Sequence, residues 1–104
     1  MSAIAAIPGA LTRTSAARDG GSTISRGGDL KQPLGLALAP NGDILTTNAA
    51  NGDIVETNPD GRQLLTRTAD RKTGAGSLFG LLVAPTGRLV YYVDDGDNTL
   101  KVLR

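Results

Sequence analysis

The residues best suited to chemistry in this chain lie in one acidic loop, Asp94-Asp95-Gly96-Asp97-Asn98. Carboxylate and amide oxygens in a loop can hold Ca²⁺, although the downstream Glu of a helix–loop–helix calcium site is absent here. Gly and Asn after Asp94 also favour a plain turn between strands. The loop therefore has two interpretations, a turn or a weak Ca²⁺ or Zn²⁺ site. The carboxylates that such a site would draw on are Asp29, Asp70, Asp94, Asp95 and Asp97.

Histidine and cysteine are both absent from the 104 residues. Ser-His-Asp and Cys-His nucleophiles are therefore excluded, as are zinc sites built from imidazole and thiolate ligands. Any catalysis would have to use carboxylates, Lys, Tyr, hydroxyls or a hard metal bound by oxygen, and no catalytic residue can be singled out. We expect no cofactor, with Ca²⁺ or Zn²⁺ as the alternative.

The charge pattern also narrows the range of partners. The net charge is +1, from 11 basic and 10 acidic residues that are mixed along the chain, which is not the basic footprint of a nucleic-acid-binding protein. No apolar stretch of ~18 residues could span a bilayer, and residues 1–7 lack the charged leader and apolar core of a signal peptide. We expect a soluble protein that binds neither nucleic acid nor membrane, and its compartment stays open.

The elements that would position these residues come from an internal repeat. The segment GLALAPNGDIL, which begins at Gly35, recurs as GLLVAPTGRLV from Gly80, an offset of 45 residues. A period of ~40–50 residues is typical of four-stranded propeller blades. Each such unit has an apolar face that it cannot bury alone, so repeat folds need several stacked copies. Only about two copies fit in this chain.

Short apolar runs separated by Asn-Gly and Asn-Pro-Asp-Gly turns predict an all-β chain of four-stranded antiparallel blades. A complete blade is expected at residues 34–68, with strands at 36–39, 44–47, 53–57 and 63–68. Residues 69–78 would form the inter-blade loop. An incomplete blade follows at residues 79–104, with three strands at 81–84, 88–93 and 99–103 and without its fourth.

Residues 1–33 would supply a partial blade, with an outer strand and a loop. Two segments, residues 11–14 and 23–26, compete for the outer strand, and residues 3–7 are expected to end a preceding third strand. A chain that begins and ends within a blade leaves strand edges unpaired. We therefore expect a closed homo-oligomer in which an N-terminal strand of one subunit pairs beside residues 100–102 of its neighbour.

The segment QPLGLALAPNGDILTTNAANGDIVETNPDG resembles the NHL repeat, with its P-x-G-[LV]-A opening, P-[ND]-G-[DN] hairpin and G-[ND]-x-[IV] third strand. The second copy, LFGLLVAPTGRLVYYVDDGDNTLKVL, keeps the pattern without the opening proline. The likeness covers residues 34–104. It implies the C-terminal portion of a six-bladed, gluconolactonase-like propeller, which two blades per chain would complete as a homotrimer.

In gluconolactonase-like propellers, an Asn before the first-strand Gly projects into the central channel and ligates calcium or zinc. The matching residues here are Leu34 and Phe79, which carry no metal donor. The resemblance therefore implies an apolar channel lining without the family metal site.

Two functions follow from this resemblance. The first is a self-assembling propeller fragment that acts as a binding or structural scaffold through its central channel face, with a small molecule in the channel as a candidate ligand. The alternative is an oligomeric hydrolase with metal-assisted esterase, lactonase or phosphotriesterase activity, which rests on fold analogy and on the five carboxylates. Four cations could line the channel entrance or simply form a solvated surface: Arg26, Arg67, Arg71 and Lys72.

Overall fold

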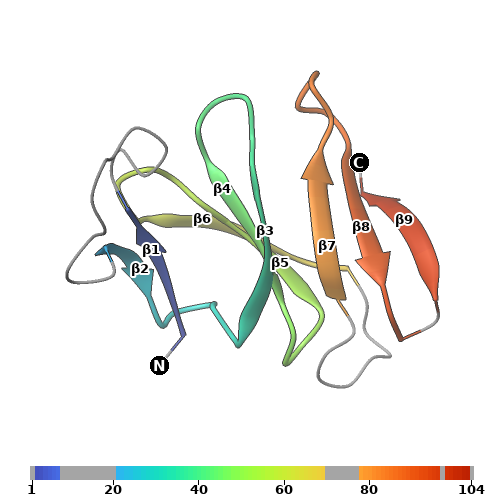
Figure 1. Cartoon of the computed structure of the whole chain (residues 1–104), viewed down its shortest axis with the longest axis horizontal. Coiled ribbons are helices and arrows are strands. Elements are labelled where there is room, and N and C mark those ends of the chain that lie inside the picture. Colours follow the sequence, from blue (N-terminus) through green and yellow to red (C-terminus); the bar gives the residue numbers. More distant parts are fainter. Residues whose placement is uncertain (1, 8–20, 70–77, 97, 104) are drawn as a thin grey trace, which may run out of the picture.

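The computed structural model describes residues 2–7, 21–69, 78–96 and 98–103 (Figure 1). Within these residues, nine strands and no helix form three antiparallel sheets, of two, four and three strands. The all-β prediction is confirmed, and the described part holds no helix of a length and apolarity that would cross a membrane. The strands are β1 (Ala3–Ala6), β2 (Ser22–Arg26), β3 (Pro33–Leu38), β4 (Ile44–Asn48), β5 (Asp53–Thr57), β6 (Gln63–Thr68), β7 (Leu78–Val83), β8 (Val90–Asp94) and β9 (Thr99–Leu103).

The central sheet is a four-stranded meander in the order β3-β4-β5-β6. Its turns contain Gly42, Gly52 and Gly61, whose φ angles are 90°, 74° and 93°, a region that L side chains rarely adopt. Strands β5 and β6 have the predicted bounds. Strand β3 begins earlier than predicted, because Pro33 already pairs with Asn48 at the end of β4.

The third sheet, β7-β8-β9, repeats the first three strands of the central sheet with one inserted residue. In the first copy, the amide of Ala39 donates to the carbonyl of Asp43 at 2.9 Å. In the second, the amide of Ala84 donates to the carbonyl of Leu89, also at 2.9 Å. The second hairpin is therefore one residue longer, and β8 begins at Val90, two residues after the predicted start.

The insertion changes which residues of the two copies are equivalent. Strand β3 matches β7 at the offset of 45 seen in the sequence. In the next two strands the offset is 46, since Thr46 pairs with Val55 in the first copy and Tyr92 pairs with Lys101 in the second. Strand β7 begins at Leu78, one residue before the expected start of the second blade.

The two N-terminal strands pair with each other. Strands β1 and β2 form an antiparallel ribbon, so residues 3–6 and residues 23–26 are both in strands. The predicted pairing of residues 23–26 beside residues 100–102 of a neighbouring subunit stays a prediction. The rival outer segment, residues 11–14, lies outside the described residues, as do residues 70–77 of the expected inter-blade loop.

The three sheets stack face to face, in chain order, across the view of Figure 1. Successive residues of a strand point to opposite faces, and in β5 both faces are buried. Val55 packs with Ile4 and other side chains toward the β1–β2 ribbon. Its neighbour Ile54 packs with Tyr92 toward the third sheet. The central sheet is therefore covered on both sides along β5.

One polar side chain ties the ribbon to the central sheet. The Nε2 of Gln63, in β6, donates to Ser25 Oγ at 3.2 Å and to the carbonyl of Gly27 at 3.0 Å. Its Oε1 accepts from the amide of Asp29 at 2.7 Å. The end of β2 and the turn that follows it are thereby held by the central sheet, independently of β1.

The β5–β6 turn also packs against the ribbon, where Gly61 lies next to the backbone of Ile24 in β2. This contact gives the first prediction. A methyl group on Gly61 would overlap the carbonyl of Ile24, whereas on Gly42 it would meet only Pro59, at 3.7 Å. Both glycines have positive φ, so each Ala variant should lose roughly 1–2 kcal/mol for its backbone. Gly61→Ala should lose a further ~1–3 kcal/mol for overpacking.

Urea unfolding of the two variants measures this difference. Gly42→Ala is the control, because it changes the same backbone property without the steric overlap. Equal losses in the two variants would show that the β5–β6 turn does not pack on β2.

Candidate functional site

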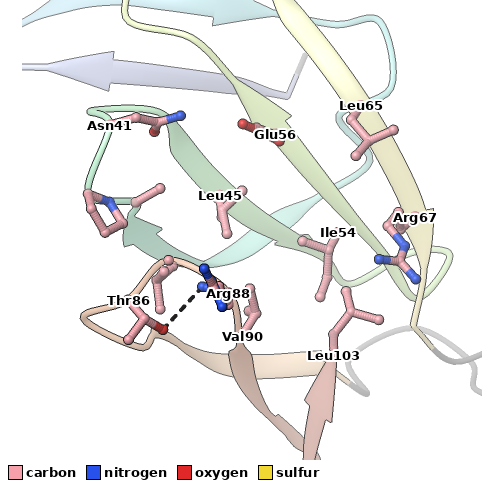
Figure 2. A pocket seen from close by; sticks show the side chains of 14 residues that line it. Asn41, Leu45, Ile54, Glu56, Leu65, Arg67, Thr86, Arg88, Val90 and Leu103 are labelled. Carbon is pink, nitrogen blue, oxygen red and sulfur yellow. Dashed lines mark hydrogen bonds between the residues drawn. The ribbon is translucent and has the colours of Figure 1, made fainter.

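A pocket of about 380 Å³ opens between the central sheet and the third sheet (Figure 2). Its apolar wall comes from both sheets, and its polar groups come from β5, β6 and the two hairpin turns. Because the walls belong to different copies of the repeat, the pocket exists only once the sheets have stacked. It is lined by Ala39, Pro40, Asn41, Leu45, Ile54, Glu56, Leu65, Arg67, Val83, Thr86, Gly87, Arg88, Val90 and Leu103.

The two hairpin turns at the pocket are each shaped by a side chain. Asn41 Oδ1 accepts from the amide of Asp43 at 3.0 Å, and its Nδ2 donates to Asp43 Oδ2 at 3.3 Å. In the second copy, Thr86 Oγ1 accepts from the amide of Arg88 at 3.4 Å. These contacts fix the turns that carry the polar groups of the pocket.

Glu56 is the acidic group of the pocket. A hydrogen bond with Asp43 raises its pKa above the ordinary value of 4.5, and burial and the like charge of Asp43 add to the effect. Arg67 and Arg88 line the same pocket. The arrangement therefore offers apolar contact, two guanidinium groups and a carboxyl that holds a proton more tightly than a solvated one, a set suited to an apolar molecule with a polar or anionic end.

The raised pKa of Glu56 gives the second prediction. Between its unfolded and folded pKa values the native state binds more protons than the unfolded state, so the free energy of unfolding should fall as pH rises from about 4.5 through the higher folded value. Glu56→Gln cannot ionise but keeps a hydrogen-bonding group toward Asp43. It should flatten this part of the profile and be at least as stable as the parent at pH 7.

Denaturant unfolding across pH 4–8 measures both profiles. Asp43→Asn is the comparison variant, because it removes the neighbouring charge and leaves Glu56 ionisable. The pH dependence of its free energy of unfolding should be less steep than that of the parent and steeper than that of Glu56→Gln. A Glu56→Gln profile as steep as that of the parent would contradict the assignment.

The structure separates the carboxylates singled out in the sequence. Asp94 is fully buried at the end of β8, where its Oδ2 lies 3.0 Å from Lys101 Nζ and its Oδ1 accepts from the amide of Gly96 at 3.1 Å. Asp95 is exposed. Asp29 belongs to the loop after β2, and its Oδ2 accepts from Thr66 Oγ1 at 2.6 Å.

The hydrogen bond from Gly96 to Asp94 lies within the acidic loop, whereas Lys101 belongs to β9. Asp70 and Asp97 lie outside the described residues. Among the residues that the structure describes, no group of three His, Cys, Asp or Glu side chains could hold a metal ion. The Ca²⁺ or Zn²⁺ site therefore stays a prediction from the sequence.

Asn48 occupies, in the central sheet, the position that Asp94 occupies in the third. It is also fully buried, and its Oδ1 accepts from the amide of Lys31 at 2.9 Å while its Nδ2 donates to the carbonyl of Asp29 at 2.7 Å. The residue equivalent to Lys101 in the central sheet is Val55. One copy of the repeat thus uses a neutral amide beside valine, and the other an ion pair.

This difference gives the third prediction. Lys101→Met removes the ammonium group beside a buried carboxylate and should lower the free energy of unfolding by about 3 kcal/mol, the lower end for breaking a buried ion pair, because the lysine side chain is 33% exposed. The double variant Asp94→Asn with Lys101→Val installs the pair found in the central sheet and should recover roughly half of this loss.

Thermal and urea unfolding of the two variants measure the effect. A double variant no more stable than Lys101→Met would show that the Asn–Val pair of the central sheet cannot replace the ion pair of the third sheet.

The two predicted channel residues lie on β3 and β7, the first strands of the two larger sheets. Leu34, in β3, is 54% exposed. The backbone of Phe79 belongs to β7, and its side chain lies outside what the structure describes. Their role as a channel lining stays a prediction.

Large apolar side chains remain exposed on two faces of the sheet stack. One group, here called the front face, lies on β3. A second group, the back face, lies on the side of the third sheet that points away from the central sheet. The front face consists of Leu34, Leu36 and Leu38, and the back face of Leu82, Tyr91, Val93, Leu100 and Val102. Of these residues, only Leu34 was singled out from the sequence, as a channel residue, because the two faces become apparent only from the strand register.

No protein-family model matches the chain, and no curated protein matches it in sequence.

Proposed function

We propose that this chain is a self-assembling β-sheet scaffold whose copies stack front face to back face into a closed, propeller-like ring. The ring would bind other molecules through its inter-sheet pockets and its central channel face. The observation that carries the proposal is that each exposed face is equivalent, in the repeat, to a face that is already covered within the chain.

The back face is equivalent to the covered side of the central sheet. Tyr91 and Leu100 correspond to Leu45 and Ile54 at the offset of 46. Leu45 and Ile54 belong to the core between the two sheets, whereas Leu100 is 73% exposed. The third sheet thus exposes to solvent the face that, in the central sheet, is buried against the third sheet.

The front face is equivalent to the side of the third sheet that packs on the central sheet. Leu36 and Leu38 correspond to Leu81 and Val83 at the offset of 45, and Leu81 and Val83 pack against the core between the sheets. Leu38 is 66% exposed. Soluble monomers rarely expose apolar patches of this kind unless they bind something. A front face and a back face from two copies would repeat the junction found inside one chain.

Such a contact joins two different surfaces, so it propagates until the rotation between copies closes a ring. Six sheets are what the resemblance to NHL propellers implies. Two repeats per chain then make a homotrimer, in which this chain is its own partner. The hydrolase alternative gains no specific support from the described residues and stays a prediction from the sequence.

Light scattering coupled to size-exclusion chromatography tests the proposal, and the fourth prediction is a parent mass of three chains. Leu38→Lys, on the front face, and Leu100→Lys, on the back face, should each give a single folded chain, because a charge replaces an exposed side chain that only the assembly buries. Leu64→Lys is the control, since Leu64 is exposed on β6 but belongs to neither face.

Mixing the two single-chain variants tests the head-to-tail geometry. Leu38→Lys keeps its back face and Leu100→Lys keeps its front face, so the mixture should form a two-chain complex that grows no further. A parent that stays a single chain at all concentrations would contradict the proposal. A parent dimer together with an unreactive mixture would replace it with a symmetric contact.

A further inference from the structure

Strands β1 and β9 hold the same position in the repeat. Strand β9 is the third strand of its sheet and matches β5, since Val90 pairs with Leu103 just as Ile44 pairs with Thr57. By this register Val102 is equivalent to Glu56. Both β5 and β9 therefore occupy the place next to an outer fourth strand, which is β6 in the central sheet.

Strand β1 matches β5 as well. The β5–β6 register shifts between Glu56 and Thr57, and the β1–β2 register shifts in the same way between Ile4 and Ala5. Aligning the two shifts makes Ile4 equivalent to Glu56. Ile4 is buried toward the central sheet, just as Glu56 points toward the third sheet in the pocket, so the facing agrees too. The β1–β2 ribbon is the outer half of a sheet, with β1 as its third strand.

In the proposed assembly, β1 of one copy and β9 of a second copy would therefore compete for the same edge of β2 in the first copy. We propose that β1 is a placeholder strand, which β9 of a second copy displaces from the edge of β2 when copies assemble. This inference rests on the proposed function. Val102 of one copy would then lie opposite Ser25 of the other, where Ile4 lies in the single chain.

The exchange is favoured by apolar burial. One antiparallel ladder replaces another, so backbone hydrogen bonds are lost and regained in similar number. The side chains differ. Ile4 of β1 points toward the central sheet, and Ser2 lies two residues earlier, just before β1, where its Oγ accepts from the amide of Gln32 at 2.9 Å. The equivalent residues of β9 are Val102 and Leu100, and both are exposed in the single chain. Burying a leucine in place of a serine stabilises the assembled state.

Strand β2 can stay in place during the exchange. Its end is held by Gln63 through hydrogen bonds to Ser25 Oγ and to the carbonyl of Gly27, and neither bond involves β1. The fourth strand is therefore anchored to its own central sheet before and after a second copy arrives.

Engineered disulfides test the exchange, since the chain has no cysteine of its own. Ile4→Cys with Ser25→Cys joins two directly opposed residues of β1 and β2, a geometry that a disulfide can bridge. The oxidised protein should remain a single chain, and reduction should restore assembly. Asp53→Cys with Thr68→Cys, across β5 and β6, is the control and should assemble in both redox states.

The converse pair detects the new contact directly. Ser25→Cys with Val102→Cys should form disulfides between chains on oxidation, giving covalent species of up to three chains. Species linked only within one chain would overturn the register.

A full-length variant with a weakened β1 keeps the test independent of disulfide formation. Ile4→Ser should assemble at about tenfold lower concentration than the parent, because β1 is displaced more easily. Ala3→Ser, on the exposed side of β1, should match the parent. Assembly of the oxidised Ile4→Cys, Ser25→Cys variant, or an Ile4→Ser variant that assembles no better than the parent, would overturn the exchange while leaving the proposed function intact. A parent that never assembles would overturn both.

Discussion

The structure depends on one constraint, which is that a sheet of this repeat has two apolar faces. Val55 and Ile54 are neighbours in β5, and one packs toward the ribbon while the other packs toward the third sheet. A sheet with a polar outer face could end the stack, but neither copy has one. The ribbon, the third sheet and the two exposed faces are all consequences of this pattern, because each sheet needs a neighbour on both sides.

The polar groups inside the stack show how two copies of a repeat can diverge without changing the fold. At the end of β4, the side-chain amide of Asn48 hydrogen-bonds to the backbone of Asp29 and Lys31. At the equivalent end of β8, Asp94 forms an ion pair with Lys101. Both solutions leave the buried polar group hydrogen-bonded, as interiors require. The ion pair takes the place of a valine, so the second copy gives up apolar contact for charge.

Much of this fold was predictable from the sequence, because alternation and turn residues act locally. Strands β5 and β6 begin and end where the pattern places them. The longer second hairpin was not predicted, since Pro85 and Gly87 keep the turn signature while one inserted residue shifts the pairing. The pocket was also missed, because Arg88 and Glu56 belong to different copies and carry no motif. Asp94 was singled out, but its partner Lys101 depends on strand pairing that composition does not reveal.

The differences between the two copies of the repeat bear on how many ligand molecules a closed ring could bind. The pocket inside a chain has Glu56 on one wall and Arg88 on the other. At a junction between chains, the place of Glu56 would be taken by Val102, and that of Leu45 by Tyr91. A closed ring would then contain two alternating kinds of inter-sheet site rather than six identical ones. A ligand that needs the carboxyl and guanidinium groups would saturate the ring at one molecule per chain, half the number of its sheet junctions.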